Sequence, residues 1–206
     1  MALGEVSVVS ALSQLYMEIA RCEGCELSRH RKQVVPGEGA EDADLLLIGE
    51  APGWHEDQQG RPFVGAAGHF LDELLRSIGM GREDVYIANV IKCRPPSNRD
   101  PLPDEISACR NWLDRQIELI SPKVIVTLGR HSLAQFLPGD AIGKVHGKAQ
   151  KKDGIIYFAM YHPAAALHQQ SLRQVIMEDM LKIPPFLAQA AEVVEEEHKP
   201  EQLSMF

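Results

Sequence analysis

The stretch ADLLLIGEAPGWHEDQQGRPFVGAAG, residues 43–68, joins a short apolar run to a loop rich in glycine and acidic residues. The run is continuously apolar after its first residues, which predicts a buried strand from Asp44 to Ile48. Gly49–Gly68 then hold five glycines, two prolines, two glutamates and one aspartate. Because glycine permits close approaches and backbone conformations that other residues resist, this loop is expected to bring its backbone against a ligand.

The rest of the chain alternates between strand and helix patterns. Further strands are predicted at residues 84–92, 122–129 and 154–162, and helices at residues 6–21, 68–80, 104–120, 130–137 and 171–183. Short, continuously apolar strands between helices favour a three-layer α/β/α sandwich with a central, mainly parallel four-stranded sheet. Ligands of such folds bind at the carboxyl ends of the strands, where loops leave after Gly49, Asn89 and His162.

Length and charge limit the possibilities. The 206 residues can bury one full core, and we expect one domain over residues 1–188 and an acidic, flexible tail over residues 189–206. The net charge is −8, but five acids against one lysine after residue 190 account for −4 of it, so a DNA-binding face is not excluded. No apolar run is long enough to span a bilayer and the N-terminus lacks a secretory signal, so we expect a cytoplasmic protein.

The chain has four cysteines: Cys22, Cys25, Cys93 and Cys109. Two structural disulfides are not expected in a reducing cytoplasm, so metal binding is the leading interpretation. A zinc ribbon usually has two tight CxxC pairs, and only Cys22 and Cys25 form one here. Four thiolates from scattered positions suit a 4Fe-4S cluster as well, and the spacing by itself favours cluster and zinc about equally.

The loop after the first strand carries three carboxylates, Glu50, Glu56 and Asp57. It has neither a GxGxxG motif nor the Lys-Ser/Thr ending of a P-loop, and its acids would repel a bare phosphate. Carboxylates suit a reaction that develops positive charge or positions a water molecule, and cleavage of a glycosidic bond does both. Asp57, taken alone, is more often a cap or turn residue.

Three other residues fit a site for a planar ligand that forms hydrogen bonds. Phe63 offers a flat face, the Asn89 amide donates and accepts in one plane, and His162 can donate to a developing anion. Taken singly, each is more often structural than functional. Asn89 and His162 share with Glu50 a position at the strand ends, and this common position favours a site.

Three segments, GEAPGWHEDQQGRPFVGAAG, NVIKCRPPSNRDP and HPAAAL, resemble the motifs of the family 4 uracil-DNA glycosylases, the iron–sulfur branch of bacteria and archaea. The resemblance extends from about Cys22 to Leu187 and includes the cysteine pattern. It implies a DNA-repair enzyme that flips uracil out of DNA and hydrolyses its N-glycosidic bond, leaving an abasic site. It also implies a 4Fe-4S cluster, expected to be structural, whose ligands are Cys22, Cys25, Cys93 and Cys109.

The resemblance further implies roles for the pocket residues. Phe63 would stack on uracil, Asn89 would read its O4 and N3 edge, and His162 would face O2 and stabilise the departing anion. The backbone of Ala51 would donate into the pocket, although some members of the family have glycine at this position. These assigned residues include no lysine that would form a Schiff base, so a monofunctional glycosylase without a lyase step is expected.

The resemblance assigns Glu50 and Glu56 to the organisation of the loop and of the attacking water. Trp54-His55 replaces a more acidic pair seen in relatives, which leaves the division of work between the two glutamates open. A sister group carries a longer basic loop with a histidine that captures the sugar covalently. The corresponding segment here, residues 92–103, is short and has no histidine, so turnover is expected rather than a trapped adduct.

Contacts with DNA outside the pocket are predicted at five positions. Leu167 can wedge into the space that a flipped base leaves, or it can be an ordinary packing residue. The cations of the loops are candidates for phosphate contacts, although a solvated surface explains each one equally well: Arg94, Arg99, Lys144 and Lys148.

The chain ends in QLSMF, residues 202–206, which resembles the short peptide by which bacterial repair proteins dock on the replication sliding clamp. In that interpretation Leu203, Met205 and Phe206 enter an apolar groove and Gln202 forms a hydrogen bond at its rim. The acidic residues before the peptide would act as a flexible tether. The alternative is a frayed terminus.

Two other classes of function also fit parts of the sequence. An iron–sulfur redox or electron-transfer protein would explain the cysteines, but it would leave Asn89, His162 and the loop at residues 49–68 without a task. A catalytically silent DNA-binding module is the third possibility. We expect the protein to act as a monomer on uracil-containing DNA.

Overall fold

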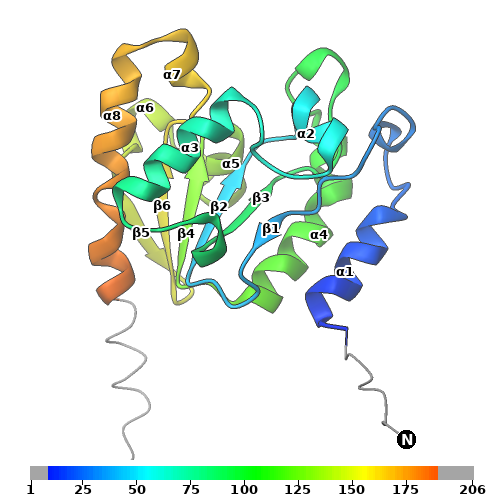
Figure 1. The fold of residues 1–206 in the computed structure, drawn as a ribbon, viewed down its shortest axis with the longest axis horizontal. Helices are drawn as coiled ribbons and strands as arrows, with labels where there is room; N and C mark the ends of the chain where they lie inside the picture. The colour runs from blue at the N-terminus through cyan, green and yellow to red at the C-terminus, as the bar shows by residue number, and fades with distance from the viewer. Residues whose placement is uncertain (1–8, 190–206) are drawn as a thin grey trace, which may run out of the picture.

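The computed structural model describes residues 9–189, whose fold is shown in Figure 1. Six strands form one sheet in the order β1-β3-β2-β4-β6-β5. Their bounds are Glu38–Gly39 (β1), Leu45–Gly49 (β2), Tyr86–Asn89 (β3), Val124–Leu128 (β4), Ala149–Lys152 (β5) and Ile155–Met160 (β6). The four inner strands run parallel, while β1 and β5 pair antiparallel at the two edges.

Helices cover both faces of this sheet (Figure 1). One face packs against α1 (Ala11–Ala20), α4 (Pro103–Ile120) and α5 (Arg130–Phe136), and the other packs against α3 (Ala66–Ser77) and α8 (Ser171–Met180). The side-chain alternation along β2 shows the division, because Leu46 and Ile48 belong to the first core and Leu45 and Leu47 to the second. The structure is therefore the three-layer α/β/α sandwich that the sequence predicts.

The structure differs from the sequence-based expectation at the periphery. The sheet has six strands rather than the four expected. The two additional strands, β1 and β5, are short edge strands without an apolar run, so the sequence pattern does not predict them. The first helix begins at Ala11, since Ser10 caps it by accepting a hydrogen bond from the backbone N–H of Ser13 at 3.1 Å, and residues 6–8 of the expected helix lie outside the described residues. The loop at residues 49–68 contains a short helix, α2 (Trp54–Gln59), that the sequence does not predict.

The carboxyl ends of the parallel strands meet at one edge of the sheet. β2 ends at Gly49 and β3 at Asn89, and these two residues are register partners. His162 follows the neighbouring end of β6. Figure 1 shows α2 together with the short helices α6 (Ile142–Val145) and α7 (Ala165–His168) along this upper edge. Over residues 9–189, none of the helices has the length and apolar character needed to cross a membrane.

Candidate active site

One cavity lies where the loops after β2, β3 and β6 meet, and its volume is about 180 Å³. Its walls are formed by Ala51, Gly53, Glu56, Phe63, Ala67, Asn89, His162 and Ala164. The structure thus brings together, around one space, five residues that the sequence assigns to the pocket: Ala51, Glu56, Phe63, Asn89 and His162. Glu50, the remaining candidate, is not among the residues of the wall.

Asn89 places an unpaired acceptor at this cavity. Its surface is 2% exposed, and its buried Oδ1 has no hydrogen-bond partner among the described residues. Since a buried acceptor without a partner costs free energy, this oxygen indicates a ligand that donates a hydrogen bond. Gly49 makes room for the amide, because a Cβ at Gly49 would lie 2.4 Å from Asn89 Oδ1 and 2.7 Å from Phe63 Cζ.

Phe63 presents its ring to the cavity beside His162. The two ring centroids lie 5.4 Å apart, and the ring planes make an angle of 25°. The backbone of Phe63 has φ +52°, in the left-handed region that bulky residues rarely adopt. The loop closes tightly around it, since a Cβ at Gly68 would lie 1.7 Å from the Phe63 carbonyl oxygen, so this approach requires glycine at position 68.

His162 supplies a neutral hydrogen-bond donor. Burial lowers the pKa of His162 to about 4, although the neighbouring Glu56 carboxylate opposes the shift, so the ring is uncharged at neutral pH. Its Nδ1 accepts a hydrogen bond from the backbone N–H of Ala164 at 3.1 Å. This bond assigns the single proton of the neutral ring to Nε2, which is left to donate to a ligand.

Glu56 holds the glycine-rich loop in shape. Its Oε1 accepts hydrogen bonds from the backbone N–H groups of Val64 at 2.9 Å and Gly65 at 3.0 Å. Asp57, next to it on α2, is buried and accepts a hydrogen bond from the backbone N–H of Lys32 at 2.8 Å. Glu56 therefore both orders the loop and brings a carboxylate to the cavity, whereas Asp57 has the structural task that the sequence allows for it.

Glu50 lies beside a group of charged residues at the rim. Its Oε2 is 3.8 Å from His131 Nε2, and the same nitrogen is 3.4 Å from Asp100 Oδ2. Burial raises the pKa of Glu50; His131 and Arg130 oppose this effect, and Asp100 adds to it. Ligand atoms of Glu50, Asp100 and His131 lie within 4.8 Å of one another, but Arg130, ion-paired with Asp100, already supplies a cation there.

Lys92 belongs to the second motif, yet it is directed away from the cavity. It is 1% exposed, and its Nζ donates to the Asn89 carbonyl oxygen at 2.8 Å and to Gln116 Oε1 at 2.6 Å. Burial lowers the pKa of Lys92 to about 8. Among the described residues, no lysine lines the cavity. The geometry therefore offers no amine for a Schiff base with the sugar.

The four cysteines come together beside α1 and α4. They are free thiols and line one small cavity: Cys22, Cys25, Cys93 and Cys109. Burial raises the pKa of Cys109 to about 11 and also raises the pKa of Cys93. Four cysteines around one cavity form a donor set that fits metal-bound thiolates, because a bound metal ion would displace the thiol protons.

N–H groups directed at the sulfurs support this interpretation. Arg31 Nη1 donates to Cys93 Sγ at 3.2 Å, and Trp112 Nε1 donates to Cys22 Sγ at 3.3 Å. The backbone N–H of Lys92 lies 3.3 Å from Cys109 Sγ. Such donors stabilise thiolate relative to thiol, as the outer partners of metal-bound sulfur do.

The predicted DNA contacts have different surroundings. Leu167 is 51% exposed on α7 and borders a shallow groove that the loop at residues 64–66 also lines. Lys144 and Lys148 are exposed, and Lys148 Nζ donates to the Lys144 carbonyl oxygen at 2.8 Å. Helices α6 and α7, which carry Lys144 and Leu167, lie along the upper edge of the sheet (Figure 1).

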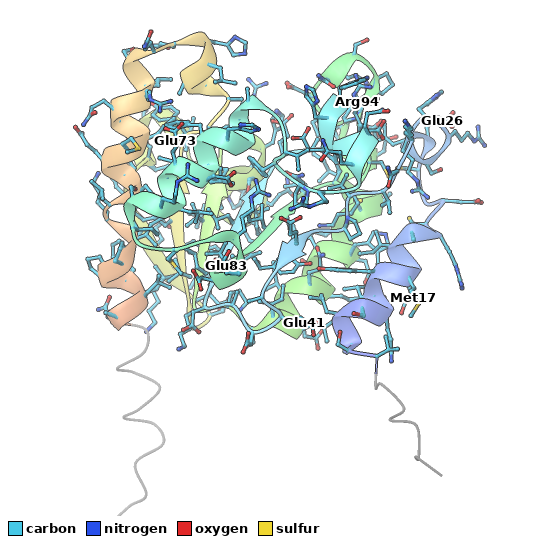
Figure 2. The ribbon with its side chains drawn as sticks, viewed as in Figure 1. Met17, Glu26, Glu41, Glu73, Glu83 and Arg94 are labelled. Carbon is cyan, nitrogen blue, oxygen red and sulfur yellow. The ribbon has the colours of Figure 1, made fainter. Side chains whose placement is uncertain are left out.

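The two arginines are held by local partners. Arg94 lies toward the same upper edge in Figure 2, and its Nε donates to Asn98 Oδ1 at 2.7 Å. Arg99 forms a two-pronged ion pair with the buried Glu105, at 2.6 and 2.9 Å. Glu105 also accepts from the backbone N–H of Leu102 at 2.8 Å, so Arg99 takes part in the cap of α4.

Sequence reasoning assigns no role to four residues at the site, and of these only His131 lies outside the three motif segments. Ala67 and Ala164 line the cavity, while Asp100, in the loop before α4, and His131, at the start of α5, approach Glu50 from distant parts of the sequence. A signal for His131 exists, because it follows the end of β4, a fourth parallel strand whose carboxyl end meets the same edge.

Comparisons with a protein-family model and with individual known proteins point to the same family. The model of the uracil DNA glycosylase superfamily matches residues 36–182. The type-4 uracil-DNA glycosylase of Sulfurisphaera tokodaii is 48% identical, over 85% of this chain and 84% of that protein. The type-4 enzymes of Archaeoglobus fulgidus and Thermotoga maritima are 46% and 45% identical, over 85% and 82% of this chain and 92% and 91% of those proteins. The chain belongs to the uracil-DNA glycosylase superfamily and, within it, groups with the type-4 enzymes.

Proposed function

We propose that this protein removes uracil from DNA by hydrolysing the N-glycosidic bond of a nucleotide flipped out of the helix, and that it leaves an abasic site. The observation that carries the proposal is the unpaired Oδ1 of Asn89, a buried residue that lines the cavity together with Phe63 and His162. Uracil has the complementary chemistry, because its N3–H donates beside two carbonyl oxygens on one planar ring.

Each of these three side chains has one task in the proposed reaction. Phe63 stacks on the face of uracil, and Asn89 accepts from N3–H while its NH₂ group donates to O4. His162 donates Nε2–H to O2, where negative charge gathers as the bond to the sugar breaks. Because burial holds the pKa of His162 at about 4, the donor is a neutral imidazole whose charge does not depend on pH in the neutral range.

The carboxylates act on the sugar side. Breaking the bond leaves an oxocarbenium-like sugar, which the negative charge of Glu56 stabilises from the wall of the cavity. Glu50 takes a proton from the attacking water, and its raised pKa makes it a better base than an ordinary glutamate. We propose turnover rather than capture of the sugar, because residues 92–103 hold no histidine that could attack it.

DNA is held around the cavity by exposed side chains. Leu167 enters the space vacated by the flipped nucleotide, and Lys144, Lys148 and Arg94 contact phosphates. Arg99 contributes to the same face through its charge, although Glu105 neutralises part of it. The exposure of Leu167 and of the two lysines at the edge that carries the cavity supports this assignment.

A 4Fe-4S cluster is the proposed cofactor, and its ligands would be Cys22, Cys25, Cys93 and Cys109. Zinc held by four sulfurs at about 2.3 Å would draw them to about 3.8 Å from one another. No three cysteine sulfurs within residues 9–189 lie inside 4.8 Å of one another, which favours a larger inorganic core. The bound cluster would supply a structural link from α1 to α4 and to the loop after β3.

The C-terminal peptide is proposed to bind the sliding clamp through Gln202, Leu203, Met205 and Phe206. These four residues lie outside the described residues, as does the rest of the proposed tail from residue 190 onward. Deletion of residues 202–206 tests the proposal, since the intact chain should bind a bacterial clamp and the shortened chain should not. We also propose that the enzyme works as a monomer in the cytoplasm, where its DNA substrate lies.

A duplex carrying one uracil tests the main proposal. The wild-type protein should release free uracil and leave an alkali-labile abasic site, while a matched duplex with thymine at that position should stay intact. His162→Ala should lower the rate of release by a factor of at least about 100 without loss of the folded state. A brown protein that releases no uracil would overturn the proposal and favour a redox function instead.

A further inference from the structure

Phe63 keeps an unfavourable backbone conformation at the point where the proposed function places the uracil ring. Its φ of +52° lies in the left-handed region, which a bulky residue adopts only when its surroundings impose it. The residue is 5% exposed, so the strained backbone is packed into the protein. Some group must therefore hold the peptide units on either side of Phe63.

Arg82 is that group. It lies in a short 3₁₀ turn, Arg82–Asp84, just before β3, and its side chain is 18% exposed. Its Nη1 donates to the Pro62 carbonyl oxygen at 3.0 Å, and its Nη2 donates to the Phe63 carbonyl oxygen. One guanidinium thus binds two consecutive carbonyl oxygens, one before and one after the Phe63 α-carbon.

Two carboxylates fix the guanidinium in turn. Arg82 Nε donates to Asp72 Oδ1 of α3 at 2.7 Å, and Nη1 also reaches Glu38 Oε1 of β1 at 3.1 Å. Burial acts to raise the pKa of Glu38, but Arg61 and Arg82 hold it below its usual range, so Glu38 is charged at neutral pH. Arg82 therefore ties the Phe63 loop to α3 and to the edge strand β1.

We propose that Arg82 is a positioning residue that holds Phe63 in its stacking conformation before uracil arrives. Arg82 is not part of the cavity wall, so it acts through Phe63 and not by contact with the base. This role for Arg82 rests on the proposed function, because it assumes that Phe63 is the residue that stacks on uracil. Only arginine can serve all four acceptors, since its rigid fork carries five N–H donors and lysine carries three on one atom.

Arg61 provides a matched control. Its Nη2 donates to Glu38 Oε1 at 2.9 Å and its side chain is 57% exposed, but within residues 9–189 it donates no hydrogen bond to a carbonyl oxygen of the Phe63 loop. Arg61→Gln thus removes a cation from the same carboxylate and leaves the two loop carbonyls bound. Arg82→Gln removes a cation from Glu38 and also removes the donors to the two loop carbonyls. Arg82→Lys keeps the positive charge but loses the forked guanidinium.

The experiment compares the three variants with the wild-type protein on an oligonucleotide that contains one uracil. For Arg82→Gln we expect kcat to fall by about tenfold to about a hundredfold, because loss of positioning at the stacking ring misplaces the flipped base. KM for the oligonucleotide should change less than about threefold, since the phosphate contacts remain. Inhibition by free uracil should weaken by about tenfold as well. Arg82→Lys should resemble Arg82→Gln, and Arg61→Gln should resemble the wild type.

Hydrogen–deuterium exchange supplies a readout that does not depend on activity. Exchange of residues 61–68 should become faster in both Arg82 variants and stay at the wild-type rate in Arg61→Gln. Equal exchange and equal kcat in Arg82→Gln and Arg61→Gln would overturn the proposal. So would an Arg82→Lys variant with wild-type kcat, because a simple positive charge would then suffice. If the wild-type protein releases no uracil, the proposed function fails, while the exchange of residues 61–68 still decides whether Arg82 holds the loop.

Discussion

Gly49 and Asn89 are register partners on β2 and β3, and a Cβ at Gly49 would lie 2.4 Å from Asn89 Oδ1. The same Cβ would lie 2.7 Å from Phe63 Cζ, so the absence of a side chain at position 49 sets the position of both the amide and the ring. Gly49→Ala should therefore lower kcat/KM for uracil release by about a hundredfold.

The strands of this variant should still form, because β2 is fully buried and the added methyl group meets side chains rather than backbone. Circular dichroism and a melting curve check the fold. A Gly49→Ala variant with wild-type activity would show that the amide and the ring move aside without consequence for the site.

The two glutamates should differ in their pH dependence. If Glu50 is the base, kcat of the wild type falls on the acid side as Glu50 becomes protonated, and burial shifts that fall to a pH above the range of an ordinary glutamate. Glu50→Gln should lower kcat by at least about a hundredfold and abolish the acid limb. Single-turnover rates from about pH 4 to about pH 8 measure both effects. An acid limb that persists in Glu50→Gln assigns the base elsewhere.

Glu56→Ala should behave differently from the Glu50 variant, because it removes the acceptor of two loop N–H groups, those of Val64 and Gly65. We expect a loss of stability of about 1–3 kcal/mol together with a loss of activity. Denaturant unfolding measures the first quantity. Unchanged stability would mean that the loop keeps its shape without Glu56.

His162 should make the folded protein less stable in acid. Its folded-state pKa of about 4 lies below the ordinary value of 6.5, so between these values the unfolded chain binds a proton that the folded chain does not. The free energy of unfolding therefore falls as the pH drops from 6.5 toward 4, by at most about 3 kcal/mol from this residue. Above pH 6.5 the contribution is constant. Unfolding curves of the wild type and His162→Gln should diverge in this window, and parallel curves would contradict the assignment of a neutral ring with a lowered pKa.

The cysteine site should contribute to stability rather than to chemistry. Cys109→Ser should lose iron and sulfide and lower the melting temperature by at least about 10 °C, on a scale of about 2–4 °C per kcal/mol for a domain of this size. Ser28→Ala is the matched control, because Ser28 lines the same cavity without being a ligand, and its Oγ donates only to the Cys25 carbonyl oxygen at 2.8 Å. A Cys109→Ser protein with full iron content would exclude Cys109 as a ligand.

The inner sheet could be predicted from sequence because its strands are continuously apolar. Buried parallel strands such as Val124–Leu128 leave a local pattern that needs no tertiary context. The edge strand Ala149–Lys152 is mostly exposed and polar, so its identity depends on pairing with β6 and not on its own composition. Helix α2 is hard to predict for a related reason, since it has only six residues and its N-cap, Gly53, has no side chain to form a capping hydrogen bond.

The residues of the cavity wall stand in motifs, which is why sequence alone could group Phe63, Asn89 and His162. Residues that act through other residues cannot be recognised from a sequence motif in this way. Arg82 looks like an ordinary surface cation in the sequence, and only the folded chain brings its guanidinium to the carbonyl oxygens of Pro62 and Phe63. His131 likewise meets Glu50 only because β4 and β2 are neighbours in the sheet.

The central claim is that Asn89 Oδ1 accepts the N3–H of a uracil ring bound in the cavity, and methylated uracils test it most directly. We predict that free uracil and 1-methyluracil both inhibit uracil release, because each keeps N3–H and position 1 is where the sugar is attached. 3-Methyluracil, which lacks that proton, should inhibit at least about tenfold more weakly. Equal inhibition by 1-methyluracil and 3-methyluracil would contradict the account, because the Asn89 acceptor would then have no part in recognising the base.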